Sequence, residues 1–202
     1  MVILDRQEEC DVRAVVWWSV VAVLTVVGGA GSALGQAYAS RVPLPAGIPT
    51  IEIWKGERRM QLRQGDEVLR EFRISLGRAP KYPKELRGDL RTPVGRYFIT
   101  GKKQSRFHRF LGLNYPNVED AERGYARGLL DAAQWADIYL AGLRGDAPSA
   151  HTVLGGWIGI HGYGHRPYMQ VDWTEGCIAV SNEDAEYLYE ELAIGTPVVI
   201  HE

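Results

Sequence analysis

The chain has 202 residues, a length typical of one folded domain with additional segments. Its 23 Lys and Arg nearly balance 25 Asp and Glu, and the formal net charge of -2 argues against a nucleic-acid-binding protein or a broad polybasic membrane patch. The hydrophobic fraction of 46% excludes a disordered chain, and two cysteines without a C-x-x-C pair exclude a disulfide-rich scaffold or a zinc ribbon.

Residues 1–39 predict export. The stretch 14–35 has no charge, and its apolar part is about as long as a signal-peptide core and shorter than a membrane span of about 20 residues. An A-x-A site at 37–39 predicts cleavage; an uncleaved segment would anchor the protein in the inner membrane. The acidic residues before the uncharged stretch fit an export signal poorly, so we expect the true start of the protein nearer Val12. A buried core helix is the alternative to an export segment. We therefore expect a periplasmic or cell-envelope protein.

Export determines how the two cysteines are interpreted. Cys10 precedes the apolar stretch and is lost on cleavage, which leaves Cys177 as a single thiol in an oxidising compartment. A leftover cysteine there indicates a reactive thiol or intermolecular pairing. A buried, inert cysteine is the alternative.

The remaining chain predicts a proline-rich linker at 40–49 and a mostly β domain at 50–202. Apolar and polar residues alternate in several short runs, as they do in half-buried strands, and Gly and Pro separate the runs. The predicted strands are 50–54, 58–63, 68–75, 96–101, 157–161, 177–180 and 196–201, with a hairpin turn at 64–66.

Two helical regions interrupt this pattern. In the insert at 117–148, Asn117 followed by Asp120 predicts a helix start, and a second helix is predicted at 131–143. The insert is either a lid over a cleft or packing against the sheet edge. A C-terminal helix is predicted to begin at Ser181 and to stop at Gly195, with one apolar face turned to the core.

His161 and Cys177 carry the candidate chemistry. The thiolate is the reactive form of cysteine, and a nearby imidazole can accept its proton. His161 ends an apolar strand, so we expect its ring to be exposed at a strand end. Gly176 permits a tight turn that points backbone amides at one spot, as an oxyanion hole requires. A structural histidine and a small core cysteine are the alternative.

Four motifs in order resemble the L,D-transpeptidase catalytic domain, also called YkuD, over roughly residue 48 to the C-terminus. The matching segments are GDLRTPVGRY at 88–97, IHG at 160–162, TEGCI at 174–178 and GTPV at 195–198. The resemblance implies a β-sandwich or barrel-like fold with a helical insert and a C-terminal helix. It also implies an exported enzyme that acts on peptidoglycan stem peptides without a metal or organic cofactor.

The resemblance also implies a role for each matching residue. Cys177 corresponds to the nucleophile that attacks the third stem residue, and His161 to the general base, oriented by the carbonyl of Gly162. The amides of Gly176 and Cys177 correspond to the oxyanion hole.

The chain departs from the family pattern in two places. Glu175 replaces a common His, and an ionised Glu175 close to the thiol would raise the pKa of Cys177. Ala179 replaces an Arg or Asn associated with substrate binding. Other polar side chains are therefore candidates to bind a stem carboxylate. These are Tyr163, His165, Arg166, Arg106 and His108, and Glu175 is a further candidate substrate-binding residue.

The sequence leaves several functions open. The first is a transpeptidase, whose acyl acceptor is another stem or a wall-attached protein. The second is a peptidoglycan hydrolase, in which water resolves the same acyl-enzyme. The third is a zinc peptidase using His161, His165, Glu175 and Cys177, although the glycines between the histidines disfavour a helical metal pair. A non-catalytic wall-binding module is the fourth.

Overall fold

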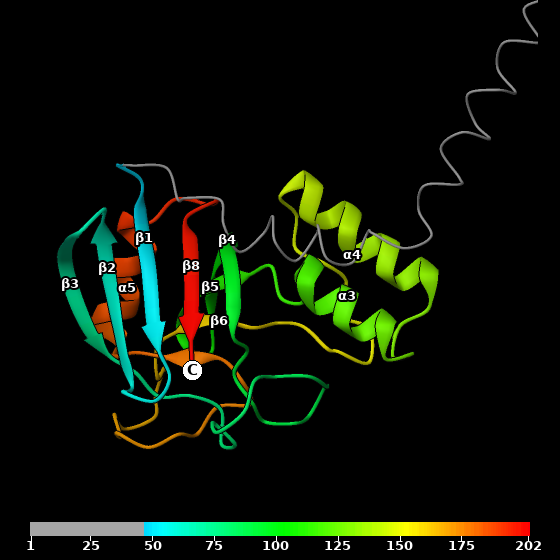
Figure 1. Ribbon diagram of the computed structural model, residues 1–202. Helices are drawn as coiled ribbons and strands as arrows, with labels where there is room; N and C mark the ends of the chain where they lie inside the picture. The colour runs from blue at the N-terminus through cyan, green and yellow to red at the C-terminus, as the bar shows by residue number, and fades with distance from the viewer. Residues whose placement is uncertain (1–46) are drawn as a thin grey trace, which may run out of the picture. The chain divides into compact units, whose positions relative to one another are not determined.

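The computed structural model describes residues 47–202, and the predictions for 1–39 and most of the linker lie outside these residues. Eight strands form one sheet in the order β3-β2-β1-β8-β4-β5-β6-β7 (Figure 1). Within residues 47–202, no helix is long and apolar enough to cross a membrane.

The strands in the first half of the sheet lie within two residues of the predicted bounds. They are β1 (Pro49–Trp54), β2 (Arg59–Gln64), β3 (Glu67–Arg73) and β8 (Pro197–His201). β1 pairs antiparallel with β2 and parallel with β8, and Gly65 takes a positive φ in the predicted hairpin turn.

The second half contains a hairpin that the sequence reading missed. β4 (Gly95–Ser105) is longer than predicted, and it pairs with β5 (His108–Leu113), for which no strand was predicted. Two short strands complete this half, β6 (Gly159–His161) and β7 (Ile178–Ala179). Both are shorter than predicted; Trp157 has φ +60°, which is outside the range of a strand.

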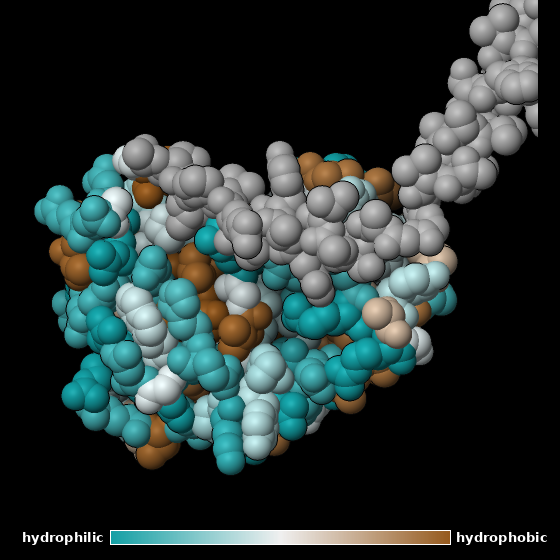
Figure 2. Space-filling view, in the orientation of Figure 1, coloured by the Kyte–Doolittle hydropathy of each residue, from teal (hydrophilic) through white to brown (hydrophobic). Residues whose placement is uncertain are grey.

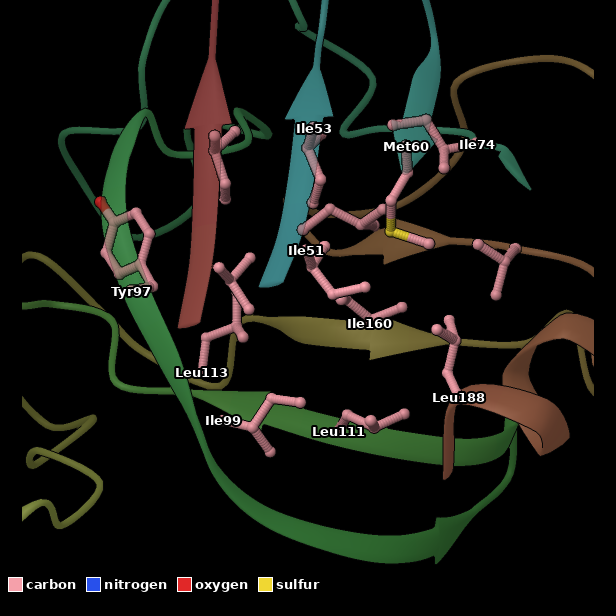
Figure 3. Close-up of a cluster of buried hydrophobic side chains, with 14 of the residues drawn as sticks. Ile51, Ile53, Met60, Ile74, Tyr97, Ile99, Leu111, Leu113, Ile160 and Leu188 are labelled. Atoms are coloured by element: carbon pink, nitrogen blue, oxygen red, sulfur yellow. The ribbon is translucent and has the colours of Figure 1, made fainter. Parts of the chain in front are cut away.

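The sheet folds over and closes on itself. Just after β3, Ser75 forms an antiparallel bridge with Ala179 of β7, so the two ends of the strand order meet. In Figure 3, β1 and β8 run across β5 and β6, and the labelled side chains fill the space between them. This closure is the barrel-like feature of the predicted fold class.

The core between the layers is aliphatic, and helix α5 contributes to it. α5 (Asn182–Glu191) is capped by Ser181 and ends four residues before the predicted stop at Gly195. Ala185 and Leu188 are fully buried, as predicted, and Leu188 faces the core in Figure 3. On the face seen in Figure 2, hydrophilic residues predominate and hydrophobic ones form separate small groups.

The helical insert packs beside β4 (Figure 1). It consists of α3 (Val118–Ala126) and α4 (Ala132–Arg144), and both helices begin with complete capping boxes, at Asn117 and Asp131. Asn117 donates from its side-chain amide to the carbonyl of Arg96 at 2.9 Å, which ties the insert to the sheet. The lid function stays a prediction.

Asp120 is a buried carboxylate that fastens α3 to β4. It accepts hydrogen bonds from the Tyr97 hydroxyl and the Asn117 amide, each at 3.0 Å, and pairs with Arg123. Burial is the largest influence on this carboxyl group and raises its pKa from 3.8 to about 6.

This pKa predicts that Asp120 costs stability as it ionises. The folded protein holds the proton more tightly than the unfolded chain, so the contribution of Asp120 to the unfolding free energy is greatest below pH 4 and is lost as pH rises to about 6. We expect Asp120→Asn to gain about 3 kcal/mol relative to wild type between pH 4 and pH 7, measured by urea unfolding. Glu119→Gln, one position earlier, is the control, and an identical pH dependence for wild type and Asp120→Asn would contradict the prediction.

Candidate active site

Strand register places Cys177 and His161 on the same face of the sheet. β6 and β7 are parallel, with Ile160 opposite Ile178 and His161 opposite Ala179. Both isoleucines are fully buried in the core, and Figure 3 shows Ile160 pointing into it. Since side chains alternate along a strand, His161 and Cys177, the residue just before β7, both point to the opposite face, one row apart.

His161 is buried, so the prediction of an exposed ring was wrong. Its side chain lies among three aromatic rings, with centroid distances of 4.8 Å to Phe107, 5.6 Å to Trp173 and 6.3 Å to Phe110. Phe107 and Phe110 belong to the β4–β5 hairpin and Trp173 precedes Cys177 in the chain, and the three rings leave His161 only 2% exposed. The strand-end position was predicted correctly.

The contacts of the imidazole fix its tautomer. Nδ1 lies 2.7 Å from the carbonyl oxygen of Gly162, as the family resemblance implied. Because a carbonyl only accepts, Nδ1 carries the proton and Nε2 is left as a base. Burial is the main influence on the ring and lowers the pKa of His161, which favours the neutral base at neutral pH.

Cys177 is a neutral thiol in the free protein. The residue is partly exposed, and its Sγ lies 3.4 Å from the carbonyl oxygen of Trp157. Close packing around the sulfur raises its pKa from 9.0 to about 11, and the charge of Glu175 acts in the same direction. A hydrogen bond from the Gly159 amide and the charge of Lys84 oppose this rise in pKa.

The thiol pKa predicts how alkylation depends on pH. Iodoacetamide reacts with the thiolate, so we expect the alkylation rate of Cys177 in the free protein to rise nearly tenfold per pH unit between pH 7 and 9, without a plateau below about pH 10. The urea-unfolded chain is the control, and its alkylation rate should reach half of its maximum near pH 8.5 and level off about one pH unit higher. A plateau near neutrality in the folded protein would show that the thiolate forms at rest.

The turn before the nucleophile requires glycine, as predicted. Gly176 has φ +133°, and an added Cβ would lie 2.6 Å from the carbonyl oxygen of Arg91. Thr174 holds this turn: its hydroxyl donates to the Cys177 carbonyl at 2.7 Å and accepts from the Gly176 amide at 3.1 Å. The Gly176 amide therefore bonds within the turn in the free protein.

Residues of the 88–97 motif support the turn that precedes Cys177. The hydroxyl of Thr92 accepts a hydrogen bond from Gly77 at 3.0 Å, and Gly77 bridges to Thr174. Asp89 accepts from the amides of its own loop and pairs at 2.8 Å with the buried Lys84. Lys84 lies near the site but was not predicted, because its neighbours in the sequence are typical of an exposed loop and do not indicate that it is buried.

Four of the predicted substrate-binding residues already have partners. The Tyr163 hydroxyl bonds to Ser75 at 2.6 Å inside the fold, and His108 pairs with Glu186 of α5 at 2.6 Å. The guanidinium groups of Arg106 and Arg166 lie over the rings of Phe107 and Trp173. The two arginines thus sit on the aromatic rings that enclose His161.

The other two predicted substrate-binding residues, Glu175 and His165, are exposed. Arg78, which lies near Glu175, is exposed as well. Glu175 is directed outward, 3.7 Å from Arg78, and His165 lies on an exposed loop. Among residues 47–202, no group of three or more His, Cys, Asp or Glu is placed to hold a metal ion. Ala179 is fully buried next to His161 and offers no polar group to a substrate.

Comparisons with known proteins agree with this geometry. The chain matches the model of YkuD, the L,D-transpeptidase catalytic domain, over residues 49–200. No curated protein sequence matches it. The match confirms the family resemblance that the four motifs suggested.

Solved structures share the fold at low sequence identity. The helical cell shape determining protein Pgp2 from Campylobacter jejuni is 22% identical, with a TM-score of 0.55, over 77% of this chain and 48% of that one. A mutant form of the same protein gives 20% identity and a TM-score of 0.57, over 79% and 49%. Bd1075 from Bdellovibrio bacteriovorus gives 18% and 0.50, over 77% and 48%. The chain thus spans about half the length of these proteins, and they confirm the predicted fold class.

Proposed function

The chain belongs to the YkuD family, the L,D-transpeptidase catalytic domain, and on this basis we propose that it is a cysteine-dependent peptidoglycan L,D-transpeptidase. Its substrates are stem peptides, and the acyl acceptor is the amine of a second stem or of a wall-attached protein. No metal or organic cofactor takes part in this proposal.

One observation carries the proposal: a neutral imidazole and a thiol share one sheet face. The bond from Nδ1 to the Gly162 carbonyl leaves Nε2 as the proton acceptor, so an acidic third residue is not required. Because the resting thiol is neutral, we place its deprotonation at the moment of attack rather than before substrate binds.

The acylation step transfers one proton and exchanges one bond. His161 Nε2 takes the thiol proton while Sγ bonds to the carbonyl carbon of the third stem residue. The backbone amide of Cys177 stabilises the oxyanion, whereas the Gly176 amide, which was predicted to share this role, donates to the Thr174 hydroxyl. The bond to the terminal D-amino acid then breaks, and its nitrogen takes the proton back from His161.

Transfer completes the cycle. The acceptor amine attacks the thioester carbon and loses a proton to His161, a new amide bond forms, and the thiol is regenerated with that proton. Water in place of the amine gives a shortened stem. The acceptor that reaches the thioester therefore distinguishes a transferase from a hydrolase.

Products from purified muropeptides test the proposal. The wild-type protein should yield cross-linked dimers, or stems with exchanged terminal residues, detected by mass spectrometry. Cys177→Ala should yield neither. If shortened monomers are the only product, the protein is a hydrolase rather than a transferase. Activity retained in Cys177→Ala would exclude an acyl-enzyme on Cys177.

We further propose that the protein works in the periplasm or cell envelope. The uncharged stretch and A-x-A site of the N-terminal sequence support export, and the substrate lies outside the cytoplasm. Amino-terminal sequencing of protein recovered from the cell envelope tests cleavage after Ala39; protein recovered only from the cytoplasm would contradict export.

A further inference from the structure

Asn182 makes three hydrogen bonds to the loop that follows His161. Its Oδ1 accepts from the Tyr163 amide at 2.8 Å and from the Gly164 amide at 2.9 Å, and its Nδ2 donates to the Gly164 carbonyl at 2.8 Å. An amide side chain can accept and donate side by side in this way, whereas a carboxylate has no donor. Asn182 therefore holds the backbone of this loop at three atoms.

The start of helix α5 does not require the Asn182 side chain. Ser181 is the N-cap residue of α5, and its hydroxyl accepts from the Asp184 amide at 3.0 Å. Asn182 is the first residue after this cap, and its side chain bonds to the loop after His161 instead of to its own helix. The helix alone does not explain an asparagine at this position.

The loop fits closely against its neighbours. A Cβ added at Gly162 would lie 2.5 Å from Asn182 Oδ1 and 3.0 Å from the carbonyl oxygen of Phe107. Gly164 has φ +64°, and an added Cβ there would lie 2.2 Å from the carbonyl oxygen of Arg106. The loop thus contacts both α5 and the turn of the β4–β5 hairpin, and neither glycine has room for a side chain.

One peptide group connects Asn182 to the imidazole. The peptide between Gly162 and Tyr163 presents its carbonyl to His161 Nδ1 at 2.7 Å and its N–H to Asn182 Oδ1 at 2.8 Å. Because a peptide group is planar, its C=O and N–H point in opposite directions and turn together. The bond to Asn182 therefore fixes the direction in which the carbonyl faces the ring, and each bond polarises the peptide in favour of the other.

We propose that Asn182 is a positioning residue for His161, because it holds this peptide so that the ring keeps its proton on Nδ1. The inference rests on the proposed function, in which His161 Nε2 accepts the thiol proton. A neutral histidine can carry its proton on either nitrogen, and the partner of the ring determines which one. If the peptide turned away, part of the molecules would carry the proton on Nε2 and could not accept another there.

Burial explains why the ring is held through a peptide. His161 is 2% exposed, and a carboxylate placed against Nδ1 would have to be buried with it at a high cost in desolvation. A carbonyl has no net charge and avoids this cost. A carbonyl in a loop can turn, however, and the bond to Asn182 removes that freedom.

The tautomer of the ring tests the inference directly. In protein labelled with nitrogen-15 histidine at about pH 8, where the ring is neutral, two-bond proton–nitrogen spectra distinguish the protonated ring nitrogen from the other. His161→Asn identifies the His161 signals among the five histidines. Wild type should show Nδ1 protonated, and Asn182→Ala should show a mixture of the two tautomers.

Turnover provides the second measurement. In the muropeptide assay, kcat of Asn182→Ala should fall by about tenfold to a hundredfold, as is typical when the partner that orients a functional side chain is removed, while KM changes by less than about twofold. Asn182→Asp keeps an acceptor for the Tyr163 amide but loses the bond to the Gly164 carbonyl. It should retain the Nδ1 tautomer, and its kcat should be at least about fivefold above that of Asn182→Ala.

Two further variants complete the experiment. Asn114 is a buried asparagine whose Oδ1 also accepts from a backbone amide, that of Phe98 in β4, at 2.8 Å. Asn114→Ala should lose stability but keep the wild-type tautomer and kcat. Gly162→Ala would displace Asn182 Oδ1 from the other side of the same contact and should give the mixture of tautomers, so the test does not depend on the folding of Asn182→Ala.

Three results would overturn the inference while leaving the proposed function in place. The first is Nδ1 still protonated in both Asn182→Ala and Gly162→Ala, whatever their turnover. The second is a mixture of tautomers in Asn182→Ala without loss of kcat. The third is the same change of tautomer and kcat in Asn114→Ala, which would assign it to a general loss of stability. Failure of wild type to react with muropeptides, with Nδ1 protonated, would instead overturn the proposed function itself.

Discussion

Replacing Cys177 with serine is expected to abolish turnover and leave the domain folded. A serine hydroxyl has a far higher pKa than the thiol and is a weaker nucleophile, and His161 with its lowered pKa is too weak a base to activate it. We expect kcat to fall by about three orders of magnitude or more in the muropeptide assay. The hydroxyl fits the space of the sulfur, so the unfolding free energy should change by about 1 kcal/mol or less.

The second cysteine of the chain is the matched control. Cys10 lies outside the described residues and precedes the predicted cleavage site, so Cys10→Ser should retain full activity. Measurable turnover in Cys177→Ser close to wild type would exclude the thiol as nucleophile. Loss of the unfolding transition in the same variant would instead show that the sulfur is needed for the fold.

Removing the base is expected to have the next largest effect. His161→Asn keeps a donor near the position of Nδ1, and therefore the bond to Gly162, but it has no basic nitrogen. General-base catalysis typically contributes about 10² to 10⁴ in rate, and we expect kcat/KM to fall within this range.

His201 offers a control on a distant strand. It is a partly exposed histidine of β8 that stacks on Trp54, and His201→Asn should leave kcat/KM unchanged. A kcat/KM of His161→Asn equal to that of wild type would exclude His161 as the base. His161→Ala leaves a cavity among three rings and is the poorer test, because its loss of stability would confound the rate.

Local chemistry made part of this fold predictable. The side chains of Asn117 and Asp131 cap helices within three residues of themselves. The spacing of Asn117 and Asp120 predicted the first helix start, and the second helix was predicted to begin at Asp131. Alternation likewise predicted β1, β2 and β3, and a Val-Val-Ile run predicted β8.

The missed hairpin between β4 and β5 shows the limit of such signals. Its turn contains no Gly, Asn or Pro, and the positive φ of +74° falls on His108 rather than on a glycine. The sequence therefore carries no turn signal that would mark the end of β4 or the start of β5. With the hairpin missing, the contacts of Phe107 and Phe110 with His161 could not be foreseen.

The candidate site was predictable in its residues but not in its environment. The motifs selected Cys177 and His161, and register then placed them on one face. Burial of His161 depends on Phe107 and Trp173, which are brought beside it by the fold and not by sequence proximity. The neutral resting state of both groups follows from that packing, so sequence alone could not supply it.

The bridge between Ser75 and Ala179 makes the nucleophile sensitive to local fraying. β7 is only two residues long, and this bridge secures the side that β6 does not cover. If the bridge between Ser75 and Ala179 opens, the thiol loses its alignment with the imidazole while the aliphatic core remains intact. Hydrogen exchange at the Ala179 amide, which donates to Ser75 at 2.8 Å, therefore reports the fraction of molecules that are competent for catalysis.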